Sequence, residues 1–356
     1  MYGVIMAGGQ GSRLRPLTLT RPKPMVEVLG RPVIDFVKDA MIEAGIDNLI
    51  VTTGYRGEQL QKHVSNWPIQ SMETHSREIS ARINQEDSPM GTAGSVRLLG
   101  DLLTETFVVG SGDSVASFDI SGLLAAHKQS GAKVTMALWE VEDPSDFGIV
   151  GLSAAHNGQL DGDLREGYIS RFKEKPSPQE AFSNVINAGL YIIEPEVLAL
   201  VPLGEKFDFS KQLFPMVLEM DWPMYAKTID GVWFDVGNPM ELLNAQSTLV
   251  ERMHELPFPM PNGSVLPGNG FCMEDAVILG DVVSSVISSN CHIEENVKIS
   301  DSLLMSGCKV GHDSTITNSV VGQNVVIGNG AKLHNVVIGD NCEIAAKIDI
   351  SDQRIP

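Results

Sequence analysis

The sequence contains few of the features that would place a protein in a membrane or outside the cell. No apolar run approaches the roughly 18 residues of a transmembrane helix. The N-terminus lacks the charged-then-apolar pattern of a signal peptide. Four cysteines (Cys272, Cys291, Cys308 and Cys342) are too few for a disulfide scaffold in 356 residues. The sequence therefore predicts a soluble, cytoplasmic protein.

Positive charge is also scarce. The chain has 26 Lys and Arg against 45 Asp and Glu, which gives a net charge of −19. This excess repels nucleic acids and anionic membranes, so we expect neither as a partner. With 43% hydrophobic residues and no low-complexity tract, the chain can bury a substantial core, and its length suggests two domains.

The N-terminal region departs from this acidic balance. Four cations precede the first acidic residue, Glu27; they are Arg13, Arg15, Arg21 and Lys23. Such a cluster on an acidic protein predicts a small, highly anionic ligand, although a solvated loop with chance clustering is the alternative. The flanking residues favour the ligand, because a short apolar strand (residues 2–7) leads directly into three glycines, whose backbone N–H groups can approach phosphate oxygens.

The whole run closely resembles the signature of the sugar-1-phosphate nucleotidyltransferases, or NDP-sugar pyrophosphorylases. It reads Gly8-Gly9-x-Gly11-x-Arg13-Leu14-x-Pro16-Leu17-Thr18-x-x-x-Pro22-Lys23-Pro24. The resemblance implies that the glycine loop wraps a nucleoside triphosphate, that Arg13 contacts the leaving phosphates and that Lys23 meets the reacting ones. It also implies a nucleotide-binding set formed by Ala7, Gly8, Gly9, Gly11 and Ser12.

Two aspartate motifs gain meaning from this resemblance. Gly112-Asp113 and Trp233-Phe-Asp235-Val-Gly237 each look like ordinary turns on their own. In the resembled family an Asp at each motif binds the catalytic Mg²⁺, and oxygen ligands suit that metal. Asp113 and Asp235 are therefore the predicted ligands. The family usually has Asn after the first Asp; Ser114 stands there, which weakens any side-chain contact at that position but not the metal site.

Two further segments resemble the sugar-binding part of the family. Glu174-Lys175-Pro176 and Asn187-Ala-Gly189 could be a surface turn and a buried strand. The resemblance implies that Glu174 accepts hydrogen bonds from sugar hydroxyls and that Lys175 meets the sugar phosphate, with Asn187 beside them. Gly148 matches a glycine whose backbone approaches the hexose.

Residues 86–94 resemble the segment that contacts the base and ribose, through Gly91 and Thr92. Glu86 precedes Pro89 by three residues. A carboxylate can accept from both N1–H and the 2-amino group of guanine, whereas relatives that use thymine or uracil carry Gln there. The stretch resembles that of the mannose-1-phosphate guanylyltransferases, which predicts GTP. A one-residue slip to Gln85 would restore a pyrimidine, so a glucose-1-phosphate thymidylyl- or uridylyltransferase remains the alternative.

The first part of the chain predicts an α/β fold. Apolar residues recur at helical spacing over 32–44, and apolar, partly β-branched runs at 48–53, 107–110 and 134–138 alternate with helical stretches. This alternation is typical of a Rossmann-like domain with a mixed, mostly parallel sheet, in which ligands bind beyond the carboxyl ends of strands. We expect the catalytic domain to span residues 1–255.

The C-terminal part has a different period. Aliphatic residues recur in steps of six, six and five from Ile287, so each of three columns repeats every 17 residues for four turns. Such a repeat predicts a parallel β-helix and resembles the hexapeptide-repeat, left-handed β-helices. Cys291, Cys308 and Cys342 fall in another column and are expected to stack as small apolar residues. This domain is predicted over 262–356, after a proline-rich joint at 256–263.

The predicted reaction is attack of a sugar phosphate oxygen on the α-phosphorus of the nucleotide, with pyrophosphate leaving. No strong general base is required, because the second pKa of a phosphate monoester is about 6. A β-helix acyltransferase is an alternative, but His292, His312 and His334 are out of step with the coil. A non-catalytic sugar-nucleotide-binding homologue is another. We expect the β-helix to serve assembly into a homo-oligomer.

Overall fold

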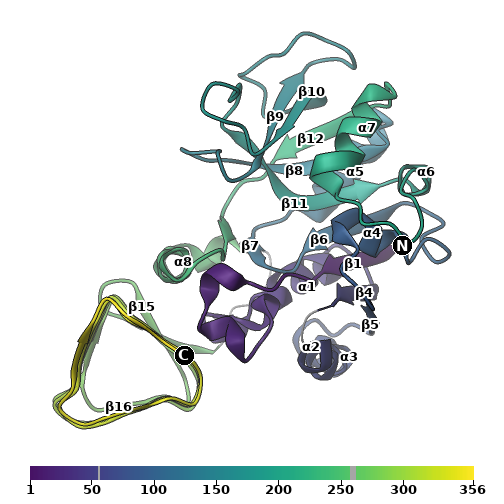
Figure 1. Cartoon of the computed structure of the whole chain (residues 1–356). Coiled ribbons are helices and arrows are strands. Elements are labelled where there is room, and N and C mark those ends of the chain that lie inside the picture. Colours follow the sequence, from purple (N-terminus) through teal and green to yellow (C-terminus); the bar gives the residue numbers. More distant parts are fainter. Residues whose placement is uncertain (55–56, 257–261) are drawn as a thin grey trace. The chain divides into compact units, whose positions relative to one another are not determined.

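The structure is a computed structural model that describes residues 1–54, 57–256 and 262–356. The chain packs into two compact units (Figure 1). The first unit comprises residues 1–8 and 36–233, and the second comprises 9–35 and 234–356. These units are defined by packing, whereas the predicted domains, 1–255 and 262–356, follow sequence motifs and stay a prediction. The segment that carries the glycine signature thus belongs to the same unit as the C-terminal repeats.

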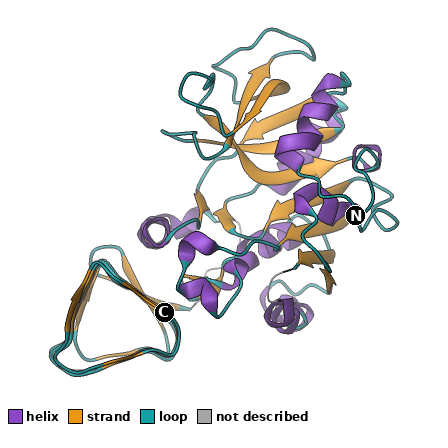
Figure 2. Cartoon of the chain, in the orientation of Figure 1, coloured by secondary structure: helices purple, strands orange, loops and turns teal. Residues whose placement is uncertain are grey.

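The described part of the first unit is built on a nine-stranded mixed sheet (Figure 2). In spatial order its strands are β5 (Ser80–Gln85), β4 (Asn48–Thr53), β1 (Tyr2–Met6), β6 (Phe107–Ser111), β11 (Val185–Ile193), β8 (Val134–Glu140), β12 (Met224–Thr228), β10 (Glu166–Glu174) and β9 (Gly148–Ser153). The strands from β5 to β6 pair in parallel, as do β8 and β12. The other neighbours are antiparallel. The predicted α/β fold with a mixed sheet is confirmed, but the sheet is not mostly parallel, because antiparallel pairs are at least as frequent as parallel ones. The glycine loop follows a strand of the parallel part.

Helices and short strands complete this unit. They are α1 (Ile34–Glu43, in this unit from Phe36), α2 (Gly57–Val64), α3 (Trp67–Thr74), α4 (Gly91–Arg97), β7 (Ser114–Ala116), α5 (Ile120–Ser130), α6 (Pro195–Leu198), the π-helix η4 (Phe209–Leu213), α7 (Phe214–Glu219) and β13 (Trp233–Asp235), at whose start the unit ends. α5 begins where the Asp119 carboxylate accepts the Gly122 N–H at 2.8 Å, and it ends at Gly131 in the left-handed region.

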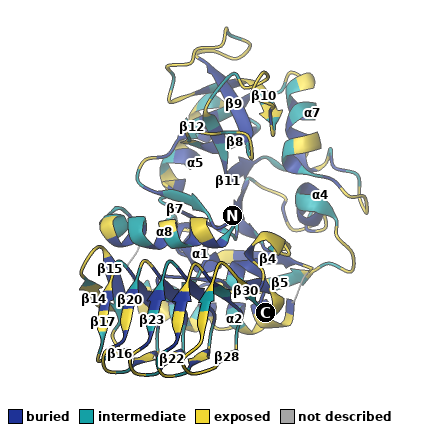
Figure 3. Cartoon of the chain, turned by 60° about the vertical axis from the view of Figure 1, so that its left-hand side comes forward, coloured by how far each residue is buried: buried dark blue, intermediate teal, exposed yellow. Residues whose placement is uncertain are grey.

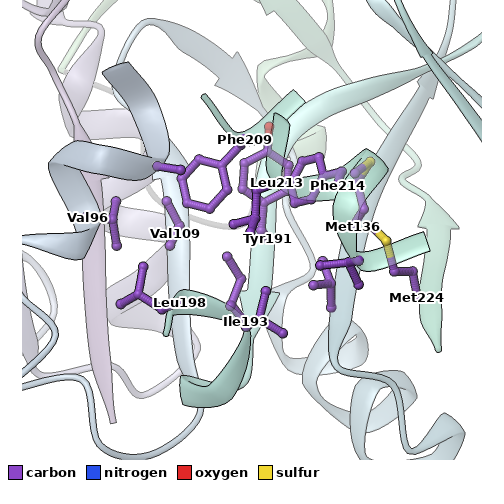
Figure 4. Close-up of a cluster of buried hydrophobic side chains, with 14 of the residues drawn as sticks. Val96, Val109, Met136, Tyr191, Ile193, Leu198, Phe209, Leu213, Phe214 and Met224 are labelled. Atoms are coloured by element: carbon purple, nitrogen blue, oxygen red, sulfur yellow. The ribbon is translucent and has the colours of Figure 1, made fainter. Parts of the chain in front are cut away.

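A buried aromatic group anchors the chain before α7 (Figure 4). Tyr191 on β11 packs against Phe214, with 4.9 Å between ring centroids, and Phe209 lies 5.6 Å from Phe214. Val96 and Val109 belong to the same cluster and are fully buried. Aromatic rings bury large apolar areas, and pairs at these separations add about 0.5–1.5 kcal/mol. This packing fixes η4 and α7 over β11, and with them the polar residues at the start of η4.

The C-terminal part of the second unit is a parallel β-helix whose cross-section is a triangle (Figure 1). One face is β14 (Gly263–Leu266), β15 (Gly270–Met273), β18 (Val286–Ile287), β21 (Leu303–Leu304), β24 (Val320–Val321), β27 (Val337–Ile338) and β30 (Arg354–Ile355). The second is β16 (Val277–Ile278), β19 (His292–Ile293), β22 (Lys309–Val310), β25 (Val326–Ile327) and β28 (Glu343–Ile344). The third is β17 (Asp281–Val283), β20 (Lys298–Ser300), β23 (Thr315–Thr317), β26 (Lys332–His334) and β29 (Asp349–Ser351).

The predicted columns are confirmed by the strand register. Ile287, Leu304, Val321 and Ile338 pair in succession and are fully buried. Buried and exposed stretches alternate along the coils of the β-helix (Figure 3). The coil before them was not predicted, because Cys272 pairs with Ile287 only fifteen positions later and so breaks the 17-residue period. This is the left-handed parallel β-helix that the resemblance implies.

Two of the three cysteines predicted to stack, and the histidines of the β-helix, lie as predicted; the third cysteine, Cys342, is only half-buried. Cys291 and Cys308 are buried in the column, and the Cys291 thiol together with burial raises the pKa of Cys308 well above its usual value. A thiol held neutral in this way is a packing group. The three histidines are exposed and form no column; His312 lies 2.7 Å from the Asp313 carboxylate, and His334 lies 2.8 Å from the Thr317 hydroxyl.

The rest of the second unit consists of short elements and one helix. They are η1 (Ser12–Leu14), η2 (Leu17–Leu19), η3 (Lys23–Met25), β2 (Glu27–Val28), β3 (Arg31–Pro32), α8 (Pro239–Arg252) and η5 (Met253–Glu255). The Gln246 amide of α8 accepts from Leu29 N–H at 2.7 Å and donates to the Glu27 carbonyl at 3.2 Å. The predicted joint falls mostly on residues 257–261, outside the described residues. Among the described helices, none is both long and apolar enough to cross a bilayer.

Candidate active site

The signature segment, residues 9–35, is shaped by Gly11. This residue has φ 61°, and a Cβ there would lie 2.9 Å from the Lys23 Cβ, so a larger residue would be strained and crowded. The Thr18 hydroxyl donates to the Gly11 carbonyl at 2.7 Å. Leu14 and Leu17 are fully buried and anchor the first two turns. The loop therefore closes back onto the lysine of its own motif.

Three of the predicted site residues meet in the second unit. The Lys23 ammonium is 2.9 Å from one Asp235 oxygen, and the Arg13 guanidinium is 3.9 Å from the other. The Lys23 side chain is 10% exposed and that of Arg13 is 57% exposed. One cation is therefore fixed inside the unit, whereas the other extends into solvent, where a phosphate can reach it.

The predicted cluster of four cations is divided. Arg21 is buried and forms an ion pair with the buried Asp340 carboxylate of the β-helix. Its Nη1 also lies 3.6 Å from the Met305 sulfur. Arg21 was read from the sequence as part of an anion-binding pocket; the structure places it in the interior of the second unit, where it has a structural role.

The remaining nucleotide-binding residues of the signature differ in their surroundings. Around Gly8 and around Gly9, a Cβ would meet no atom of the described residues within 4 Å other than those of its chain neighbours, so packing among these residues does not require glycine at either position. Open space beside bare backbone suits close approach of a phosphate. Ser12 is exposed. Ala7 is buried, and its N–H donates to the Thr52 carbonyl at 2.8 Å, so that amide is already used within the sheet.

Asp113 lies in the turn between β6 and β7 of the first unit. Its carboxylate accepts from the Ser111 hydroxyl at 2.5 Å. The neighbouring Ser114 is buried, and its hydroxyl has no hydrogen-bond partner among the described residues. The described residues contain no cluster of three or more His, Cys, Asp or Glu that could enclose a metal. Mg²⁺ usually takes only one or two carboxylates together with substrate phosphates, so single carboxylates at Asp113 and Asp235 have the donor chemistry it needs.

The predicted sugar residues meet in the first unit. Gly148 and Glu174 are direct neighbours on β9 and β10, and a Cβ on Gly148 would lie 2.8 Å from a Glu174 carboxylate oxygen. Glycine thus makes room for this carboxylate. Burial, followed by the charge of Asp208, raises the pKa of Glu174, although Lys175 and Lys211 offset part of the effect. The carboxylate is therefore a poorly solvated acceptor, ready for hydroxyl donors.

Asn187 is linked to this carboxylate through Ser210, and Lys175 follows Glu174 directly in the chain. The Asn187 amide donates to the Tyr191 hydroxyl at 2.8 Å and to the Ser210 hydroxyl at 3.3 Å, and its oxygen accepts from Gly189 N–H at 2.9 Å. Lys175 is exposed, with φ 45°, and its N–H donates to the Phe147 carbonyl at 2.9 Å. The backbone is thereby fixed while the ammonium stays in solvent.

Asp208 was missed by the sequence analysis. It caps η4 by accepting from the N–H groups of Ser210 and Lys211 at 3.0 and 3.1 Å. Its other oxygen accepts from the Thr92 hydroxyl at 3.0 Å. Asp208 therefore contacts Thr92, which is predicted to bind the nucleotide, and its charge also acts on Glu174, which is predicted to bind the sugar. An Asp before a helix is an ordinary capping signal, and only the fold shows what it connects.

Glu86 supports the start of α4. Its carboxylate accepts from Met90 N–H at 3.0 Å and from the Ser95 hydroxyl. Gly91 has φ 73°, and a Cβ on it would lie 2.5 Å from the Phe207 carbonyl oxygen, so this glycine is needed for packing. A carboxylate has about four acceptor sites, so Glu86 keeps acceptor capacity beyond these two bonds.

Two models of known protein families match the chain. The family model described as nucleotidyl transferase matches residues 2–252. The chain belongs to the nucleotidyltransferase family. A second model, the GMPPB C-terminal domain, matches residues 264–355.

Relatives of this nucleotidyltransferase cover most of its length. It is 32% identical over 297 residues to "Mannose-1-phosphate guanylyltransferase catalytic subunit beta" of Danio rerio, covering 82% of this chain and 74% of that one. It is 32% identical over 278 residues to "Mannose-1-phosphate guanyltransferase" of Saccharomyces cerevisiae, covering 76% and 70%. The predicted family and enzyme class, a sugar-1-phosphate nucleotidyltransferase, are confirmed.

Proposed function

We propose that this nucleotidyltransferase transfers the guanylyl group of GTP to mannose 1-phosphate. The observation that carries the proposal is the 32% identity to relatives named for this activity, over 82% of the chain for the Danio rerio protein. The chemistry of the site residues supports it: the cations Arg13 and Lys23 suit phosphates, and the carboxylate of Glu174 suits sugar hydroxyls.

In the proposed reaction, a phosphate oxygen of the sugar attacks the α-phosphorus. A new O–P bond forms as the bond to pyrophosphate breaks, and GDP-sugar is the second product. Arg13 and Lys23 stabilise the charge that moves onto the leaving phosphates, and Lys175 holds the attacking phosphate. Mg²⁺, held by Asp113 and Asp235, would supply further neutralisation of phosphate charge when bound. Because Asp235 already holds Lys23, less ordering of that lysine is needed on binding.

The sugar specificity is assigned to the Glu174 surroundings. Its carboxylate would accept from sugar hydroxyls, and the Asn187 amide and the Gly148 backbone would provide further contacts to the sugar. Base specificity is assigned to Glu86, with its remaining acceptor sites directed at guanine. We further propose that the enzyme works in the cytoplasm as a homo-oligomer assembled through the β-helix, which light scattering would test.

A substrate panel tests the proposed function. Four nucleoside triphosphates are assayed against mannose and glucose 1-phosphates for pyrophosphate release, and GTP with mannose 1-phosphate should give the highest kcat/KM. Glu86→Gln should lower kcat/KM for GTP at least tenfold, in keeping with about 1–3 kcal/mol for lost charged hydrogen bonds. Preference for dTTP or UTP, or greater damage from the matched variant Gln85→Ala, would overturn the guanylyl assignment. No pyrophosphate from any pair would indicate a non-catalytic homologue.

A further inference from the structure

The last coil of the β-helix contacts the backbone of the signature segment. Arg354, on β30, donates from one guanidinium nitrogen to the Arg13 carbonyl at 3.1 Å and to the Arg15 carbonyl at 2.9 Å. Both partners lie in the turn that bears the exposed Arg13 side chain. A charged donor shared by two carbonyls is a stronger restraint than a neutral hydrogen bond.

A polar column continues this contact along the β-helix. Ser306, Gln323 and Asp340 occupy equivalent positions in successive coils, 17 residues apart. Ser306 donates to the Glu27 carboxylate through its N–H at 3.2 Å and its hydroxyl at 3.0 Å, and the Gln323 amide donates to the same carboxylate. Asp340 accepts from the Gln323 N–H at 2.8 Å.

Asp340 in turn holds the middle of the signature segment. It accepts from the Thr20 hydroxyl and pairs with Arg21. The side chains of Arg21 and Asp340 are 5% and 6% exposed. Separation of the two partners would leave an uncompensated charge in the interior, which is strongly unfavourable. The pair therefore fixes Arg21 next to Asp340. The β-helix therefore contacts the signature segment at several points between Arg13 and Glu27, including the turn that bears the Arg13 side chain.

The segment needs this support because its own structure is weak. Its turns η1, η2 and η3 are 3₁₀ helices of three residues each. Such turns have few hydrogen bonds of poor geometry and little stability alone. Without external contacts the backbone that presents Arg13 would sample several conformations, and each would have to be ordered when phosphate binds.

We propose that the β-helix is a structural part of the active site, in which Arg354 and the column Ser306–Gln323–Asp340 hold residues 9–27 in the conformation that presents Arg13 and Lys23. Arg354 is thus a positioning residue: it acts through the backbone of Arg13 and Arg15 and does not touch the substrates. The expected loss of catalytic activity rests on the proposed function, whereas the expected loosening of residues 10–20 does not.

Kinetics of full-length variants test the catalytic consequence. Arg354→Ala should lower kcat/KM about 10- to 100-fold, mainly through kcat, because small misplacements of a catalytic group are costly. Arg354→Lys, which keeps a cationic donor, should recover part of the loss. Lys332→Ala, an exposed change elsewhere on the β-helix, is the matched control and should behave as wild type. Thermal melting should be unchanged in all three, since the Arg354 side chain is exposed.

Amide hydrogen exchange tests the loop directly and without substrate. In Arg354→Ala, exchange in residues 10–20 should accelerate at least tenfold relative to Lys332→Ala, while strand β8 of the first unit should not change. If exchange and kcat/KM both match the control, the proposal is wrong. If the wild type fails to turn over any substrate pair but exchange accelerates in Arg354→Ala, the proposed function fails and the positioning of the loop by Arg354 stands.

Discussion

Charge is held differently in the signature segment and around the predicted sugar and base residues. In the signature segment, the cations Lys23 and Arg21 are paired with the carboxylates of Asp235 and Asp340. In the first unit, two carboxylates near the predicted sugar and base residues are held by neutral donors: Asp208 by Thr92 and two N–H groups, and Glu86 by Met90 N–H and Ser95. Paired charges favour a fixed geometry, whereas half-buried carboxylates with neutral partners keep an unbalanced negative charge.

This difference matches the chemistry proposed for each group. Phosphates carry charge that shifts during transfer, so they need cations whose positions are fixed in advance. Sugar hydroxyls are neutral donors, and a poorly solvated carboxylate accepts from them strongly. The predictions below disrupt one kind of charge or the other.

Removal of the buried cation should have the largest effect. Lys23→Ala should lower kcat by at least about a thousandfold, since the ammonium meets charge that moves in the transition state. Steady-state pyrophosphate release measures it, with Lys332→Ala as control and circular dichroism to confirm folding. A Lys23→Ala enzyme with near-normal kcat would contradict the role of the paired cation.

Neutralisation of Asp235, the partner of Lys23, should have the second-largest effect. Asp235→Asn keeps a hydrogen-bond acceptor for Lys23 but removes the negative charge proposed for Mg²⁺, so we expect at least a hundredfold loss of activity and a higher Mg²⁺ requirement. Asp230→Asn, which changes an exposed aspartate paired with Arg165, is the control. Direct titration of Mn²⁺ should show weaker binding in Asp235→Asn; unchanged metal binding would reduce Asp235 to a structural partner of Lys23.

Disruption of the second pair should act on stability. Arg21→Met leaves the buried Asp340 carboxylate unpaired and should cost about 3–5 kcal/mol in the free energy of unfolding. The double variant Arg21→Met, Asp340→Leu removes both charges and should recover much of this loss. Urea denaturation measures both. Equal stability of single and double variants would show that the pair is not coupled.

The smallest effect is expected at the half-buried carboxylate of Glu174. Its replacement should stabilise the protein, whereas replacement of Arg21 should destabilise it. Because burial raises the pKa of Glu174, the folded protein holds this proton more tightly than the unfolded chain. Stability therefore falls as the pH rises from the ordinary pKa of 4.5 through the raised value. Glu174→Gln removes the penalty and should stabilise the protein at pH 7 by less than about 1 kcal/mol, since partial exposure screens the charge. At pH 4 the two proteins should unfold alike. The KM of Glu174→Gln for the sugar phosphate should rise. If the stability gain of Glu174→Gln over wild type were larger at pH 4 than at pH 7, the assignment of a raised pKa to Glu174 would be contradicted.

The sequence predicted best what depends on near neighbours. The columns from Ile287 and the turn at Gly11 follow from local repeats and motifs, and the first coil was missed where the spacing changed to fifteen. Arg21 and Arg13 look alike in the sequence. They differ in burial, because Arg21 packs against Asp340, 319 residues away, whereas the Arg13 side chain is largely exposed. Asp208 likewise carried an ordinary capping signal, and its link to Thr92 across 116 residues arises from the fold.

The membership of residues 9–35 in the second unit also limits how this protein can be recombined with its relatives. A chimera that exchanges only the repeats, 264–356, would place a relative's residues at positions 340 and 354 against the native loop. The geometry of the loop would then depend on contacts between residues from two different proteins. The exchangeable module is instead residues 9–35 together with 234–356. Residues of the last coil would therefore have to be exchanged together with those beside Arg13, although more than 300 residues separate them in the chain.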